Sequence, residues 1–139
     1  MTELRTDVLH RLRTEWNAWL CTLRADGSPH VTPVWFVYVP GTGTDEGAGR
    51  FWISSSERNI KVRNVESDPR VSIALEDGNS PVVAEGRAAI HRHDLPPAVV
   101  AGFAEKYDGW DITTEFERGG RRILLEVVTG RWLLAGTAQ

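Results

Sequence analysis

A serine-rich segment that joins a predicted strand to a predicted helix is the clearest candidate for chemistry in this sequence. In ISSSERNIKVRN, Ser54, Ser55 and Ser56 precede the helical residues. Hydroxyl groups and the free backbone N–H groups of a first helical turn can bind an anion together. Arg58 and Lys61 are three residues apart, so they can share one helical face. The pattern predicts a phosphate site, unless one serine only caps the helix.

The second candidate is an apolar strand that contains two prolines. The segment from Pro29 to Val39 is rich in β-branched and aromatic residues, which suit a sheet, but Pro29 and Pro33 cannot donate to a ladder. Either the prolines protect an edge strand from aggregation, or the ladder is interrupted because something other than a strand lies against this backbone. In the second case a phosphorylated planar ring lies across Val31, Thr32, Pro33, Val34 and Trp35, with its tail at residues 54–61.

Other kinds of chemistry have little support in the sequence. His91 and His93 share a strand face, but no Cys, Asp or Glu cluster accompanies them at metal spacing, so we expect no metal site. Cys21 has no recognisable nucleophile motif, and the glycines of residues 41–49 do not form a dinucleotide fingerprint. No catalytic residue is assigned, although His30 is a possible proton donor.

The length and composition of the chain are typical of one globular domain, which we expect to cover residues 1–139. Hydrophobic residues make up 41% and the net charge is −3, so nucleic acid is not expected as a partner. The chain has a single cysteine and no apolar run of membrane-spanning length. Because the start also lacks the apolar core of a signal peptide, we expect a cytoplasmic protein without a membrane span.

Hydrophobic periodicity predicts the elements that position these residues. Leu4, Val8, Leu12 and Trp16 indicate an amphipathic helix. A short helix follows from about Ile60, and a third covers residues 95–110. Strands are predicted at residues 18–23, 29–39, 50–54, 70–76, 82–91 and 121–136, the last with a possible break at Gly130. Strands joined by hairpins and short helical links predict a mainly β fold, an antiparallel sheet closed into a small barrel with helical decoration.

Three blocks of the sequence resemble a known family. RADGSPHVTPVWFVYV, SSERNIKVRNVESDPRVSIALE and VVAEGRAAI, in this order, resemble the pyridoxamine 5′-phosphate oxidase-like split-barrel flavoproteins. The small single-domain branch that uses the deazaflavin coenzyme F420 is the most similar, and the resemblance runs from about Trp16 to Leu134. It implies a homodimer of six-stranded antiparallel split β-barrels of the FMN-binding type, with two cofactor sites at the subunit interface.

The resemblance also implies roles for residues. The strand matching Val31–Trp35 backs the ring and gives backbone hydrogen bonds to its edge. The segment matching Ser54–Lys61, with Asn64 behind it, takes the phosphate and ribityl tail. Residues matching Glu85 and Gly86, or the region of Trp110, complete the pocket from the other subunit. The chain has its arginine at Arg58, three residues before Lys61, where some relatives have it two before the lysine.

The activity implied is that of an oxidoreductase. Reduced F420 would transfer hydride to a small organic acceptor, and FMN is the alternative cofactor. The same barrel is also compatible with an FMN-binding stress protein, a haem-handling protein, or a cofactor-binding module without catalysis. The cations near the serines favour F420, because its tail is the more anionic one.

Overall fold

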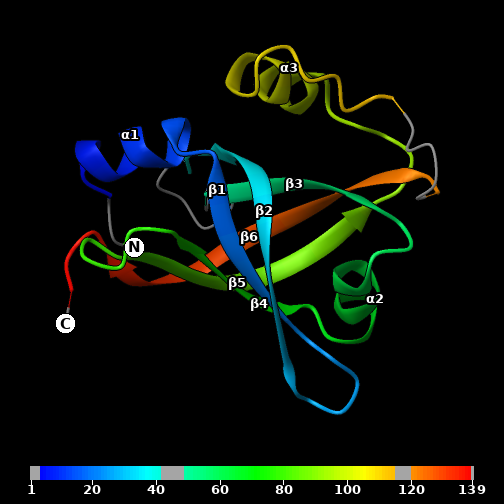
Figure 1. Cartoon of the computed structure of the whole chain (residues 1–139), viewed down its shortest axis with the longest axis horizontal. Coiled ribbons are helices and arrows are strands. Elements are labelled where there is room, and N and C mark those ends of the chain that lie inside the picture. The colour runs from blue at the N-terminus through cyan, green and yellow to red at the C-terminus, as the bar shows by residue number, and fades with distance from the viewer. Residues whose placement is uncertain (1–3, 42–48, 115–119, 139) are drawn as a thin grey trace.

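The structure is a computed structural model that describes residues 4–41, 49–114 and 120–138 (Figure 1). Its strands close into an antiparallel barrel in the order β1-β2-β3-β6-β5-β4, which confirms the predicted fold class. The strands are β1 Asn17–Leu23, β2 Pro29–Val39, β3 Arg50–Ser56, β4 Arg70–Leu75, β5 Val82–His91 and β6 Arg122–Ala135. The helices are α1 Thr6–Thr14, α2 Ile60–Ser67 and α3 Pro97–Lys106.

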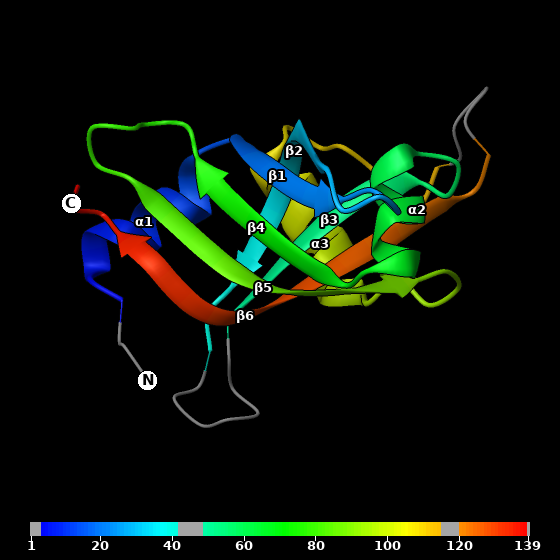
Figure 2. The same ribbon diagram turned by 90° about the horizontal axis from the view of Figure 1, so that it is seen from below.

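The barrel interior is filled by alternate residues of the strands, because successive side chains of a strand point to opposite faces. Leu20, Phe36, Ile53, Ile73 and Leu125 are among its fully buried side chains. Helices α1 and α2 add apolar residues to this core and lie near opposite ends of the barrel (Figures 1 and 2). A second apolar cluster joins the outer face of β3 and β6 to α3, which lies outside the barrel.

Strand β2 pairs with a different strand along each of its two halves. It pairs with β1 from Pro29 to Trp35, whereas it pairs with β3 only from Phe36 to Val39. Within the described residues, the first half of β2 therefore has a strand on one side only. This half is an edge, as the edge-strand interpretation of the prolines predicts.

The ladder between β2 and β1 is not interrupted at the prolines. The interruption that the second interpretation requires is found on the β3 side only. The register runs without a shift from Asn17 opposite Trp35 to Leu23 opposite Pro29. The Arg24 N–H donates to the Ser28 carbonyl at 2.9 Å. Because hydrogen-bonded pairs alternate in an antiparallel ladder, Pro29 and Pro33 then fall at positions whose backbone nitrogen faces away from β1. The prolines remove donors from the open edge only.

Two expected elements differ in detail from the structure. Strand β6 continues through Gly130, and the register with β5 shifts there instead, which is a β-bulge. Helix α3 ends at Lys106 rather than at Trp110. Asp108 and Gly109 adopt φ values of 52° and 85°, and this left-handed turn ends the helix.

The turn after α3 places Tyr107 between two strands. Continuing the β1–β2 register by one pair would put Phe36 opposite Trp16. The Tyr107 hydroxyl lies there instead, where it accepts from the Phe36 N–H at 2.8 Å and can donate to the Trp16 carbonyl at 2.7 Å or the Phe36 carbonyl at 2.9 Å. Burial raises the pKa of this phenol. One side-chain hydroxyl thus satisfies backbone groups where the two strands separate.

We predict that Tyr107→Phe lowers the free energy of unfolding by roughly 1–3 kcal/mol, because the buried backbone groups lose their partner. Urea unfolding followed by far-UV circular dichroism measures the change. Tyr38→Phe is the matched control, since the Tyr38 hydroxyl makes no hydrogen bond with the described residues. Equal losses in the two variants would show that the bridge contributes nothing specific.

Candidate functional site

A cavity of about 310 Å³ lies where β2 and β3 separate. The last paired residues are Phe36 and Ile53, and beyond them Trp35 and Ser54 stand on diverging strands. We call this place the β2–β3 fork. Among the described residues, seven line its cavity: Asn17, Pro33, Val34, Trp35, Ser54, Lys61 and Trp110. The two segments singled out in the sequence, residues 31–35 and 54–61, therefore meet at one cavity.

Lys61 brings a buried positive charge to the β2–β3 fork. It is the second residue of α2 and its side chain is among the buried polar groups, with only 9% of the residue exposed. Among the residues described, no carboxylate lies within ion-pair distance of its ammonium group. Burial lowers the pKa of this amine from its usual 10.5. A buried cation without a carboxylate partner is unfavourable, and a bound anion would compensate it.

The three serines do not converge as expected. Strand β3 extends to Ser56, so Ser55 is buried on one face of the strand while Ser54 and Ser56 lie on the other. The alternative interpretation, in which a serine caps the helix, is also wrong, because Asn59 caps α2 by accepting from the Lys61 N–H at 3.2 Å. Only Ser54 of the three lines the cavity.

Arg58 and Lys61 do not share a helical face. Arg58 precedes the first residue of α2, is exposed, and does not line the cavity. Its guanidinium lies next to Gly120, so close that an added Cβ there would come within 3.1 Å of Nε. Arg58 is therefore not placed to add a second positive charge at the fork, although its spacing from Lys61 indicated that role.

Three other expected residues lie outside the cavity lining. Val31 is exposed on the outer face of β2. The Thr32 hydroxyl is buried and has no partner among the described residues. Asn64 is also buried, and its amide donates to the Thr22 hydroxyl at 3.0 Å, which ties α2 to β1.

Arg122 is a buried cation beside the fork that the sequence did not reveal. Its guanidinium donates to the Ser54 hydroxyl and to the Thr114 carbonyl, both at 2.8 Å, and lies 5.3 Å from the centre of the Trp110 ring. Burial lowers the pKa of this group. Arg122 thereby positions two of the residues that line the cavity, Ser54 and Trp110.

The aromatic wall of the fork is also held by specific contacts. The Trp35 ring stacks on Tyr107 with 4.6 Å between centroids and 8° between planes, and its indole N–H donates to the Asn17 side chain at 3.1 Å. Trp110 meets Trp35 edge-on at 5.3 Å. Trp110 lines the cavity of its own chain, whereas the resemblance implied that this region comes from the other subunit.

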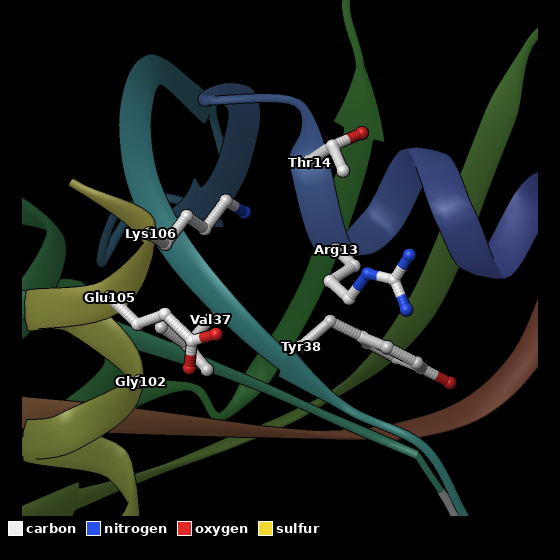
Figure 3. A pocket seen from close by; sticks show the side chains of 7 residues that line it. All are labelled: Arg13, Thr14, Val37, Tyr38, Gly102, Glu105 and Lys106. Atoms are coloured by element: carbon white, nitrogen blue, oxygen red, sulfur yellow. The ribbon is translucent and has the colours of Figure 1, made fainter. Parts of the chain in front are cut away.

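A larger cavity of about 430 Å³ lies between α1, β2 and α3 (Figure 3). Lys106 and Glu105 reach toward it from α3 and Arg13 from α1. The Lys106 ammonium donates to the Phe36 carbonyl at 2.9 Å, and burial lowers the pKa of Lys106 to about 8. None of the residues expected to bind a cofactor lines this cavity, and Lys106 is engaged in packing α3 against β2.

Neither a metal centre nor a membrane-spanning helix is found in the described parts of the chain. Within residues 4–41, 49–114 and 120–138, no group of three or more His, Cys, Asp or Glu side chains is placed to hold a metal ion. In the same residues, no helix has the length and apolar character needed to cross a bilayer.

Residues 7–134 match the family model of pyridoxamine 5′-phosphate oxidase. Among solved structures, the barrel is similar to an F420 reductase (20% identity, 95% of this chain and 98% of that chain, TM-score 0.69). It is also similar to a haem storage protein from Vibrio cholerae (18% identity, 99% of this chain and 98% of that chain, TM-score 0.70). A third example is an FMN-binding protein of Nostoc punctiforme related to pyridoxamine 5′-phosphate oxidase (18% identity, 88% of this chain and 76% of that chain, TM-score 0.59). The curated proteins include no match.

Proposed function

The chain belongs to the pyridoxamine 5′-phosphate oxidase family, and from this membership we propose that the β2–β3 fork binds coenzyme F420. In this proposal the protein is an oxidoreductase that transfers hydride to a small organic acceptor. The observation that carries the proposal is the cavity at the fork, which has an open strand edge on one wall and the buried Lys61 on the other.

The open edge of β2 suits the rim of a flat heterocycle. Backbone groups of successive β2 residues point alternately toward β1 and away from it, and the Arg24–Ser28 hydrogen bond fixes which residues do which. The backbone groups that point to the open edge are those of Val31, Pro33 and Trp35. Val31 and Trp35 offer an N–H and a carbonyl each, while Pro33 offers a carbonyl only. A ring with polar atoms on its rim is an appropriate partner for such a row, because buried backbone groups need hydrogen bonds.

The opposite wall suits a phosphate group. Lys61 supplies the charge, and Ser54 supplies a hydroxyl that Arg122 already orients. Hydrogen bonds in which both groups are ionised are the strong ones, so Lys61 is the main phosphate contact in the proposal and Ser54 adds a neutral donor. We assign smaller, supporting roles to Ser55, Ser56, Arg58 and Asn64, which lie on the same segment but outside the cavity lining.

The cofactor, when bound, supplies the hydride. The protein orients the ring between the open β2 edge and Trp110, and it leaves the remaining side for an acceptor. Trp35, held by Tyr107 and Asn17, gives this wall a fixed shape. F420 is preferred to FMN because its tail is more anionic and two buried cations are close: Lys61 lines the fork, and Arg122 lies beside it.

We further propose that the protein is a homodimer formed through the outer face of β1 and β2. Trp19, Val31 and Trp35 are exposed on this face by 43%, 55% and 41%, and Pro33 lies opposite Trp19. Such a group of neighbouring apolar side chains is typical of a subunit interface. The face borders the fork, since Pro33 and Trp35 also line its cavity.

We predict that the protein sediments as a dimer and that Trp19→Asp produces monomers, because an interface cannot bury an unpaired carboxylate cheaply. Analytical ultracentrifugation measures the mass. The matched control is Leu133→Asp, which changes a similarly exposed apolar residue on β6 and leaves the dimer intact. A monomeric wild-type protein, or dimers in both variants, would contradict the proposed interface.

For the cofactor site, we predict that F420 binds more tightly than FMN and that Lys61→Met weakens F420 binding about tenfold or more, as expected for a lost charge-assisted contact. Fluorescence titration of the cofactor-free protein measures both affinities. The free energy of unfolding should not fall, because the substitution removes a buried charge that has no carboxylate partner among the described residues. Arg63→Gln removes an exposed charge from the same helix and serves as the control.

The outcomes of this titration separate the possible functions. If neither F420 nor FMN binds, or if Lys61→Met binds F420 as the wild type does, the proposed site is wrong. If the cofactor binds but no organic acceptor reoxidises its reduced form faster than in the absence of protein, the chain is a cofactor-binding module without catalysis.

A further inference from the structure

A pocket of about 260 Å³ lies between the end of β5 and the start of β6. Three arginines and a histidine are among the residues that line it: Arg92, His93, Leu95, Thr113, Arg121 and Arg122. No carboxylate of the described residues belongs to this lining. We propose that this arginine pocket is a second anion-binding site, which takes a carboxylate or a phosphate distinct from the phosphate at Lys61.

The positive charge of the arginine pocket is only partly neutralised by the described residues. The Asp111 carboxylate accepts from the backbone N–H and the hydroxyl of Thr113, which lines the pocket, and it interacts electrostatically with Arg122. Arg92 pairs with Glu66 at 3.0 Å, but both side chains are well exposed, and such a pair contributes little. The Arg121 guanidinium contacts a ring nitrogen of His93 at 3.3 Å and forms no ion pair with a described carboxylate. Glu57 is close to Arg121, yet it accepts from the backbone N–H of that residue.

The arginine pocket has one wall that is already fixed in place. Arg122 is 8% exposed, and the Ser54 hydroxyl and the Thr114 carbonyl hold its guanidinium. A group that does not need to be ordered on binding loses less entropy, so this wall favours binding. Planar guanidinium groups are also well suited to the geometry of carboxylates and phosphates.

Arg122 connects the arginine pocket to the β2–β3 fork. It lines the pocket, while Ser54, to which it donates, lines the cavity of the fork. Two sources of the anion follow from this arrangement. One is the carboxylate-bearing far end of a cofactor tail, which rests on the proposed function. The other is a separate small anion, which does not.

The experiment compares the wild-type protein with an Arg92→Gln, Arg121→Gln double variant. Both proteins are titrated in calorimetry with F420 whose tail carries several carboxylates, with FMN, with succinate and with inorganic phosphate. An Arg63→Gln, Arg87→Gln double variant is the control, because it removes two exposed arginines that do not line the pocket.

We expect the double variant to bind F420 about tenfold or more weakly than the wild type, with FMN binding unchanged, if the anion belongs to the tail. A comparable loss confined to succinate or phosphate identifies a separate small anion and also supports the site. Unchanged binding of all four probes, or an equal loss in the control variant, overturns the inference. If the wild type binds neither F420 nor FMN, the proposed function fails, and the small anions alone then decide the arginine pocket.

Discussion

The separation of β2 from β3 at Trp35 and Ser54 is the constraint on which the rest of the structure depends. An antiparallel strand that loses a partner leaves a row of backbone donors and acceptors without strand hydrogen bonds, and such a row is available to other partners. On the β1 side, the Tyr107 hydroxyl supplies such a partner where that ladder ends. On the β3 side, the opening is lined by Lys61, Ser54 and Trp110, which leaves the cavity proposed to bind the cofactor.

Charge is distributed unevenly around this opening. The chain as a whole has a net charge of −3, so it does not attract anions through its overall field. Lys61 and Arg122 are nevertheless buried beside the fork, and burial lowers the pKa of both groups. A buried cation is unfavourable in a stable fold unless something compensates it. The anionic ligand that we propose would compensate the buried charge of Lys61.

The elements of the fold could be predicted from the sequence because hydrophobic periodicity, turn residues and prolines are local signals. No predicted strand boundary lies more than about two residues from the observed one. The local signals failed at the serines, because β3 continues through Ser56 and Asn59 takes the capping role. Local signals do not reveal Arg122, and the region of Trp110 was indicated by the family resemblance alone. Arg122 contacts Ser54, which is 68 residues away in the sequence, and Trp110 contacts Trp35; both contacts form only when the barrel closes.

The measurement that tests the central claim most directly is a crystal structure of the protein with bound F420. The account predicts that the ring rim contacts the backbone of Pro33 and Trp35 and that a phosphate oxygen lies within hydrogen-bond distance of the Lys61 ammonium. A ring bound in the cavity between α1 and α3, or a phosphate held away from Lys61, would contradict it.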